Sequence, residues 1–224
     1  MNITPALLES DFESIQQKAT LFAGITPIIQ IDICDGVFVV STTWPYTVGD
    51  NWKTSIEALH SLKDISILYE LDLMIQNPET TLPLWMLTNP RRIVIHIDST
   101  SDFSRCCSVL RGYQLEYPKF TYGIAISINS DLSQLRKYIK MVDFIQIMGI
   151  ATIGIQHSEF DSRVCDLIQS VSTMDKEIPI HIDGGMNAQS IPGCFAVGAS
   201  EFIVGSAIFS AQDPQLAFEK LQQL

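Results

Sequence analysis

The chain has 224 residues, 46% of them hydrophobic, and a formal net charge of −11 at pH 7. This acidic balance disfavours nucleic acid and anionic membranes as partners, because both recognise basic patches. No basic N-terminal stretch precedes a long apolar core, so we expect neither a signal peptide nor a membrane span, and the five cysteines indicate reduced thiols in the cytoplasm.

Apolar segments of strand length alternate with helical segments along the chain. The expected strands are Ile3–Leu7, Ile28–Ile33, Leu68–Leu73, Arg92–Ile97, Tyr122–Ile128, Phe144–Met148, Ile178–Ile182 and Glu201–Val204. The expected helices are Leu8–Ala23, Trp52–Lys63, Leu82–Thr88, Phe103–Tyr113, Ser130–Met141, Asp161–Met174, Ala188–Val197 and Asp213–Leu224. Eight strands that alternate with eight helices predict one α/β domain over residues 1–224, a (β/α)8 TIM barrel.

Two connections are longer or richer in special residues than the others. The segment from Gly36 to Asn51 has the composition of an ordered active-site loop, and we expect its aromatic residues to pack the loop or a subunit interface. The segment from Gly149 to Glu159 is a candidate lid over the site. We interpret His157, which lies within it, as a solvated loop histidine.

Two glycine turns follow the last two expected strands. One is Gly184-Gly185 after His181-Ile182-Asp183, and the other is Gly205-Ser206 after Phe202-Ile203-Val204. Glycine lets backbone N–H groups approach an anion closely, and a following helix adds favourable partial charge. Because (β/α)8 barrels form phosphate sites after strands 7 and 8, this ordered pair predicts a site for a small phosphorylated ligand.

An aspartate lies at or next to the C-terminal end of three of the expected strands. Side chains at every second residue of a strand share a face, so Gln30 and Asp32 face the barrel axis together, and Asp72 and Asp183 occupy matching positions. Three carboxylates at close quarters cannot all stay ionised unless a cation neutralises them. The alternative interpretation is that each aspartate caps the helix that follows it. We interpret His96 and His181 as core histidines.

Several segments resemble the ribulose-phosphate 3-epimerase family, in that family's order and spacing and over nearly the whole chain. They are Thr4-Pro5-Ala6-Leu7-Leu8-Glu9-Ser10-Asp11-Phe12, Asp32-Ile33-Cys34-Asp35-Gly36-Val37-Phe38-Val39, Leu73-Met74-Ile75-Gln76-Asn77-Pro78-Glu79, Val94-Ile95-His96, Asp183-Gly184-Gly185 and Gly205-Ser206-Ala207-Ile208-Phe209. The resemblance implies a ribulose-phosphate-binding type of barrel and metal-assisted epimerisation at C3 of a pentulose 5-phosphate.

In such enzymes one aspartate on strand 2 and one on strand 7 exchange the proton at opposite faces of the sugar, and Asp32 and Asp183 match them. The resemblance also assigns Met74 and Met148 to the wall around the intermediate. It assigns Gly184, Gly185, Gly205 and Ser206 to the phosphate site. Family members usually oligomerise, so we expect a homo-oligomer.

The chain departs from the family at the metal site. The family uses two histidines and the two aspartates, whereas this chain has Gln30 and Asp72 at the histidine positions and Ala6 in place of a serine. If a metal binds, the expected ligands are Asp32, Asp72, Asp183 and the Gln30 carbonyl oxygen. All-oxygen coordination favours Mg²⁺ or Mn²⁺ over the Zn²⁺ or Fe²⁺ known in the family.

Two hypotheses remain open from the sequence. The first is a divergent sugar-phosphate epimerase, and the alternative is a non-catalytic phosphosugar-binding relative that has lost its metal. A lyase or aldolase is disfavoured, because no lysine lies inside any expected strand. The Asp-x-Lys unit that decarboxylase relatives carry on strand 3 reads Asp72-Leu73-Met74 here.

Overall fold

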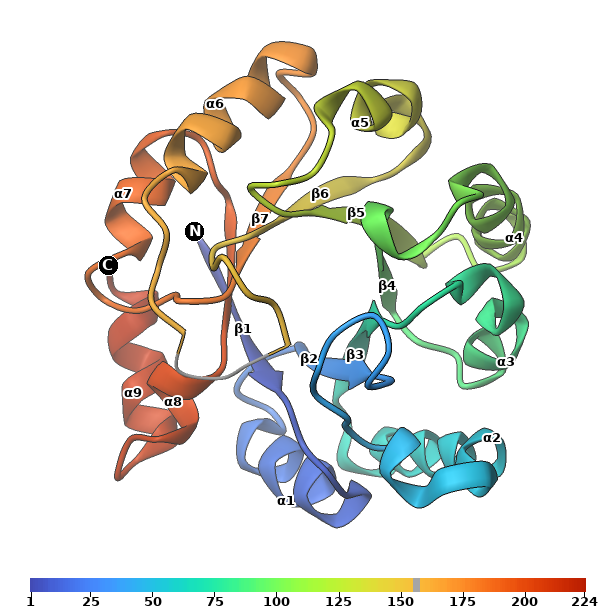
Figure 1. The fold of residues 1–224 in the computed structure, drawn as a ribbon. Helices are drawn as coiled ribbons and strands as arrows, with labels where there is room; N and C mark the ends of the chain where they lie inside the picture. The colour runs from blue at the N-terminus through green and yellow to red at the C-terminus, as the bar shows by residue number, and fades with distance from the viewer. Residues whose placement is uncertain (155–157) are drawn as a thin grey trace.

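The computed structural model describes residues 1–154 and 158–224, and within them eight parallel strands close into a barrel (Figure 1). Each strand pairs with its neighbours in sequence, and β1 closes the barrel against β8. The strands are β1 (Asn2–Leu7), β2 (Ile28–Cys34), β3 (Leu68–Met74), β4 (Arg92–His96), β5 (Thr121–Ile126), β6 (Phe144–Met148), β7 (Ile180–Asp183) and β8 (Glu201–Val204). The predicted (β/α)8 architecture is therefore confirmed.

Helices surround the barrel and cover the outer face of its strands (Figure 1). They are α1 (Phe12–Phe22), α2 (Trp52–Ser55), α3 (Leu82–Leu87), α4 (Phe103–Glu116), α5 (Leu132–Tyr138), α6 (Val164–Met174), α7 (Ile191–Ala196), α8 (Ser206–Phe209) and α9 (Pro214–Gln222). Short 3-10 helices are η1 (Tyr46–Asn51), η2 (Ile56–Ile65), η3 (Pro78–Thr80), η4 (Ile97–Ser99) and η5 (Ile139–Met141).

Local chemistry explains where the observed elements differ from the expected ones. The first helix begins at Phe12 rather than Leu8, because the Asp11 carboxylate caps it by accepting from the Ser14 backbone N–H at 2.8 Å. Strand β7 begins only after Pro179, which has no backbone N–H to donate to a ladder. The predicted helix Trp52–Lys63 is α-helical for one turn and continues as η2.

The main hydrophobic core lies between the barrel and its helices. Outward-facing strand residues such as Ile29, Ile31 and Ile33 are at most 1% exposed and pack beneath the helices. Burying one such side chain contributes about 1.5–3 kcal/mol, so this outer layer makes a large favourable contribution to stability. The inside of the barrel has a different composition, because polar and charged side chains project into it.

The N-terminal half of the barrel interior holds a group of ionisable residues: Glu70, Arg92, His181 and Glu201. Arg92 forms ion pairs with Glu70 and Glu201, and its Nη1 donates to Glu201 Oε2 at 3.0 Å. Despite burial, the hydrogen bonds and charge of Arg92 and the charge of His181 lower the pKa of Glu201 to about 2. Burial raises the pKa of Glu70 to about 8 and lowers that of His181 to about 4.

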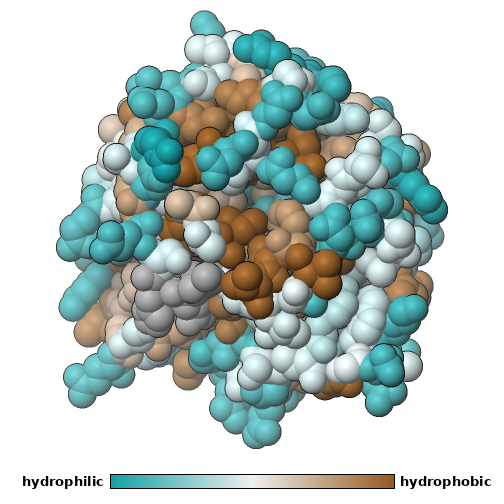
Figure 2. Space-filling view, in the orientation of Figure 1, coloured by the Kyte–Doolittle hydropathy of each residue, from teal (hydrophilic) through white to brown (hydrophobic). Residues whose placement is uncertain are grey.

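The loop after β2 is held by aromatic contacts, as its composition predicts. The Trp44 ring lies 5.0 Å from that of Phe12, and the Tyr46 ring lies 4.7 Å from that of Trp52, which begins α2. Figure 2 shows the same face of the molecule as Figure 1. Apolar side chains gather near its centre, and polar side chains surround them. In the part of the chain that the structure describes, no helix has the length and apolar character to cross a membrane.

Candidate active site

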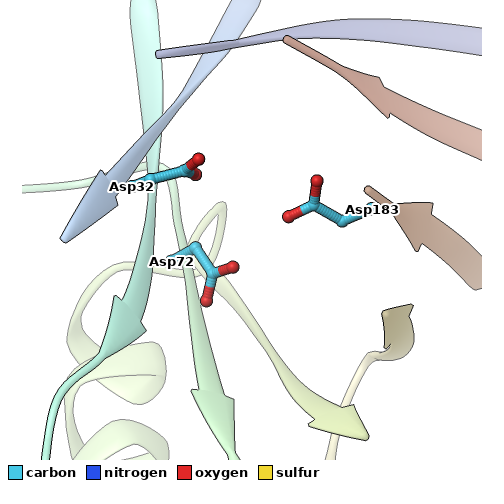
Figure 3. A group of neighbouring side chains, drawn as sticks. All are labelled: Asp32, Asp72 and Asp183. Atoms are coloured by element: carbon cyan, nitrogen blue, oxygen red, sulfur yellow. The ribbon is translucent and has the colours of Figure 1, made fainter. Parts of the chain in front are cut away.

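Three aspartates meet inside the C-terminal end of the barrel (Figure 3). Asp32 and Asp72 lie side by side in register on β2 and β3, and Asp183 ends β7 and points toward them from across the barrel. One carboxylate oxygen of each lies within 4.8 Å of the others. The structure thus brings together the three carboxylates that the two-residue strand period placed on the inner face.

Two buried side-chain amides hold these carboxylates in place. The Gln30 amide nitrogen donates to Asp32 Oδ1 and to Asp183 Oδ2, both at 2.8 Å. The Gln146 amide nitrogen donates to Asp72 Oδ2 at 3.0 Å and to Asp183 Oδ2 at 3.2 Å. Both glutamines are fully buried, and within the described residues neither amide oxygen accepts a hydrogen bond. The amides therefore offset part of the repulsion between the carboxylates.

His96 completes the ring of polar contacts around the aspartates. Its Nε2 lies 2.9 Å from Asp72 Oδ1, and its ring packs 5.3 Å from that of Phe38. The residue is 3% exposed. His96 is therefore a histidine of the barrel interior whose polar atom is satisfied by Asp72, as the sequence interpretation has it.

The crowded carboxylates have strongly perturbed acidity. Burial, followed by the charge of Asp72, raises the pKa of Asp183 to about 7. Burial, followed by the charges of Asp183 and Asp72, raises the pKa of Asp32 well above its ordinary value. Both shifts have the cause expected for acids that share a site of low dielectric. Both shifts favour retention of a proton by these carboxylates toward neutral pH, and a bound cation would oppose it.

A single cavity connects the aspartates with the glycine turns. Its wall includes the two opposed aspartates, both predicted methionines and all four predicted phosphate-site residues: Asp32, Met74, Met148, Asp183, Gly184, Gly185, Gly205 and Ser206. Asp72 and Gln30 stand behind this wall, fully buried. The loop from Gly149 to Glu159 contributes Ile150, Gly154 and Ser158 to the wall, while His157 lies outside the described residues.

The turn after β7 needs glycine for both conformation and space. Gly184 and Gly185 have φ angles of 99° and 70°, which side-chain-bearing residues rarely adopt. A Cβ on Gly185 would lie 2.8 Å from Phe160 Cα. The Gly185 carbonyl accepts from Asn187 Nδ2 at 3.1 Å and from Ser190 Oγ at 2.9 Å, which fixes the turn.

Gln146 is the site residue that the sequence analysis missed. It is the polar residue of the apolar run Phe144–Met148, and it lies two positions before Met148, on the same inward face. The same two-residue period that selected the aspartates could have found it. His181 lies deeper, with its ring stacked 4.2 Å from that of Phe144, and it does not line the cavity.

The sequence is similar to known proteins over nearly its whole length. The model of the ribulose-phosphate 3 epimerase family matches residues 2–209. The ribulose-phosphate 3-epimerase of Aquifex aeolicus is 25% identical over 99% of this chain and 96% of its own, and that of Mycobacterium leprae is 24% identical over 99% and 93%.

Solved structures with low sequence identity share the fold. The 3-hexulose-6-phosphate synthase of Salmonella typhimurium has a TM-score of 0.73 at 16% identity, covering 100% of this chain and 97% of that one. The KGPDC of Streptococcus mutans in complex with D-R5P has a TM-score of 0.75 at 11% identity, covering 99% and 95%.

Proposed function

Because the chain belongs to the ribulose-phosphate 3-epimerase family, we propose that it interconverts ribulose 5-phosphate and xylulose 5-phosphate by moving the proton at C3. The observation that carries the proposal is one cavity lined both by opposed carboxylates and by a glycine turn. An isomerase of this kind needs an acid or base on each face of the reacting carbon. It also needs an anchor that holds the rest of the substrate still.

Asp32 and Asp183 are the proposed proton carriers. One carboxylate takes the proton from C3, which leaves an enediolate, and the other carboxylic acid returns a proton to C3 from the opposite face. Their support is positional: they come from β2 and β7, on different sides of the barrel, and both reach the cavity wall. Gln30 contacts both carboxylates and so orients them toward the same space.

The phosphate group is proposed to bind at Gly184, Gly185, Gly205 and Ser206. The positive φ angles of the first two glycines allow backbone to face the ligand without a Cβ in between. Met74 and Met148 supply an apolar part of the wall of the same cavity. An anchor made of backbone groups also explains how an acidic protein can hold an anion without lysines at the site.

The residues present fit a hard divalent cation. Asp32, Asp72 and Asp183 offer carboxylate oxygens, and Gln30 and Gln146 each carry a buried amide oxygen without a hydrogen-bond partner among the described residues. Rotation of a glutamine amide by 180° about its terminal carbon–carbon bond exchanges the positions of its nitrogen and oxygen, so either amide oxygen can be turned toward the carboxylates. This donor set favours Mg²⁺ or Mn²⁺. When bound, such a cation would stabilise negative charge on the substrate oxygens.

Deuterium exchange tests the proposal directly. The purified protein is incubated with ribulose 5-phosphate in D2O, with Mn²⁺, Mg²⁺, Zn²⁺ or Fe²⁺ added in turn, and C3 is followed by NMR. We expect deuterium to enter C3, and we expect Asp32→Asn and Asp183→Asn to slow its entry by about 10²-fold or more. Absence of exchange with every metal would contradict the proposal.

The alternative, a phosphosugar-binding relative without turnover, has one observation in its favour. The Gln30 and Gln146 amides already bridge all three carboxylates, so the acidic group is held together by protein contacts alone. Tight binding of ribulose 5-phosphate with no exchange at C3 under any metal would favour this function. Exchange that depends on Asp32 and Asp183 would exclude it.

A further inference from the structure

A second cavity lies at the other end of the barrel from the acidic group. It has a volume of about 510 Å3 and is formed by the segments that lead into β3, β4 and β5. This volume falls in the range of about 300–1,000 Å3 that is typical of small-molecule sites. None of its lining residues is shared with the cavity at the aspartates. It is therefore a separate candidate site.

The walls of this cavity are apolar and partly aromatic. Ile67, Leu68, Tyr69, Tyr117 and Phe120 line it, and Leu68 and Tyr117 are 49% and 43% exposed. The Tyr69 hydroxyl donates to the Thr88 carbonyl. Tyr117 stacks on Tyr113 with ring centroids 4.2 Å apart. The two tyrosines are thus held in place, so the cavity presents preformed apolar surface.

Positive charge is concentrated around these apolar walls. Lys63, Arg91 and Lys119 line the cavity against one carboxylate, Glu116, although the whole chain carries a net charge of −11. The Arg91 Nη1 atom is buried and, among the described residues, has no hydrogen-bond partner. The Arg91 backbone N–H donates to the Tyr69 carbonyl at 2.9 Å, which fixes the base of the side chain. The Nη1 atom has almost no exposed surface through which a ligand in the cavity could reach it, so what Arg91 offers an acidic group is the positive charge of the guanidinium beside the cavity.

We propose that this cavity binds a small amphipathic anion, namely an aromatic or aliphatic body that ends in one acidic group. The body fits between Leu68, Tyr69 and Tyr117, and the acidic head is bound by Arg91, with Lys63 and Lys119 adding attraction. Charge complementarity selects the anion, because a neutral apolar molecule would leave the excess of Lys63, Arg91 and Lys119 over Glu116 unbalanced. A second copy of this chain that used the same surface would bring the same excess of cations to the contact, so charge repulsion disfavours it as the occupant.

The fluorescent probe 8-anilinonaphthalene-1-sulfonate has the proposed chemistry, since it joins aromatic rings to one sulfonate. N-phenyl-1-naphthylamine is its neutral counterpart. Both are titrated into the folded protein, whose native packing is checked by near-UV circular dichroism. We expect saturable binding of the sulfonate at one site per chain and at least tenfold weaker binding of the neutral probe.

Variants locate the binding site. Arg91→Gln is expected to weaken sulfonate binding at least tenfold and to leave binding of the neutral probe unchanged, and Leu68→Glu is expected to abolish sulfonate binding. The matched control is Arg163→Gln, which removes an exposed arginine paired with Asp161 and should change nothing at this cavity.

Three results would overturn the proposal. The first is sulfonate binding that Arg91→Gln leaves intact. The second is displacement of the probe by inorganic phosphate with the same affinity that phosphate has for the glycine turn, because the probe would then lie in the other cavity. The third is an oligomer in sedimentation velocity that Leu68→Glu dissociates, since the cavity would then be an interface between copies.

Discussion

Replacement of Asp183 by asparagine should separate the energetic cost of burying this acid from its proposed role. Asp183 is 8% exposed, and its pKa of about 7 compares with an ordinary value of 3.8. The folded state therefore holds a proton that the unfolded chain releases, so the wild type loses stability as the pH rises from about 4 to about 7. The shift of about 3 pKa units corresponds to a loss of about 4 kcal/mol in the free energy of unfolding at pH values above that range.

Asparagine removes the charge and keeps an oxygen that can accept from Gln30 and Gln146. We therefore expect Asp183→Asn to raise the free energy of unfolding by about 2–4 kcal/mol at pH 8, and by less than half as much at pH 5. The same variant should lose deuterium exchange at C3. A gain in stability combined with a loss of turnover is the signature of a strained functional residue.

Urea unfolding of chelator-treated protein, followed by circular dichroism at pH 5 and pH 8, measures this effect. Asp213→Asn is the matched control, because Asp213 caps α9 by accepting from Leu216 N–H at 3.0 Å and asparagine caps equally well. Asp183→Asn with equal or lower stability than the wild type at pH 8 would refute the reasoning. Charge repulsion would then not be the dominant cost at this site.

Three further outcomes are expected. Gly185→Ala should lower the free energy of unfolding by about 1–3 kcal/mol and weaken phosphosugar binding in calorimetry, because Gly185 has a positive φ angle and an added Cβ would clash with Phe160. The control Gly193→Ala should do neither, because its added Cβ meets no atom within 4 Å. Glu201→Gln should cost about 3 kcal/mol in urea unfolding at pH 7; because the folded pKa is about 2, this difference should shrink as the pH falls below about 4.5. Mn²⁺ should raise the midpoint of thermal unfolding of the wild type, and an equal rise in Asp72→Asn would argue against the oxygen site.

The strands and the acidic group could be predicted because their signals are local. Apolar runs mark the strands, and a period of two places Asp32, Asp72 and Asp183 on the inner face whatever the rest of the chain does. What could not be predicted depends on register across several strands. Arg92 meets Glu70 and Glu201 only because β4, β3 and β8 project to the same level inside the barrel.

The departures at the metal site show the same limit. The resemblance identifies Gln30 as a change from the family. It does not show that the Gln30 amide, besides contacting Asp32 on its own strand, reaches Asp183 on β7. The two-residue period places Gln146 on the inner face of its strand, but it does not show which side chains the amide contacts. The partners that give it a role lie on β3 and β7.

The pairing of β1 with β8 joins residues 2–5 to residues 201–204. Asp32 and Asp183 are therefore brought to face each other by a seam whose two sides are almost two hundred positions apart in sequence. A polypeptide emerging from the ribosome lacks this seam until its last strand is free, so nascent chains carry both acids without an assembled site. Catalytic competence would then arise only after the last strand has paired with the first.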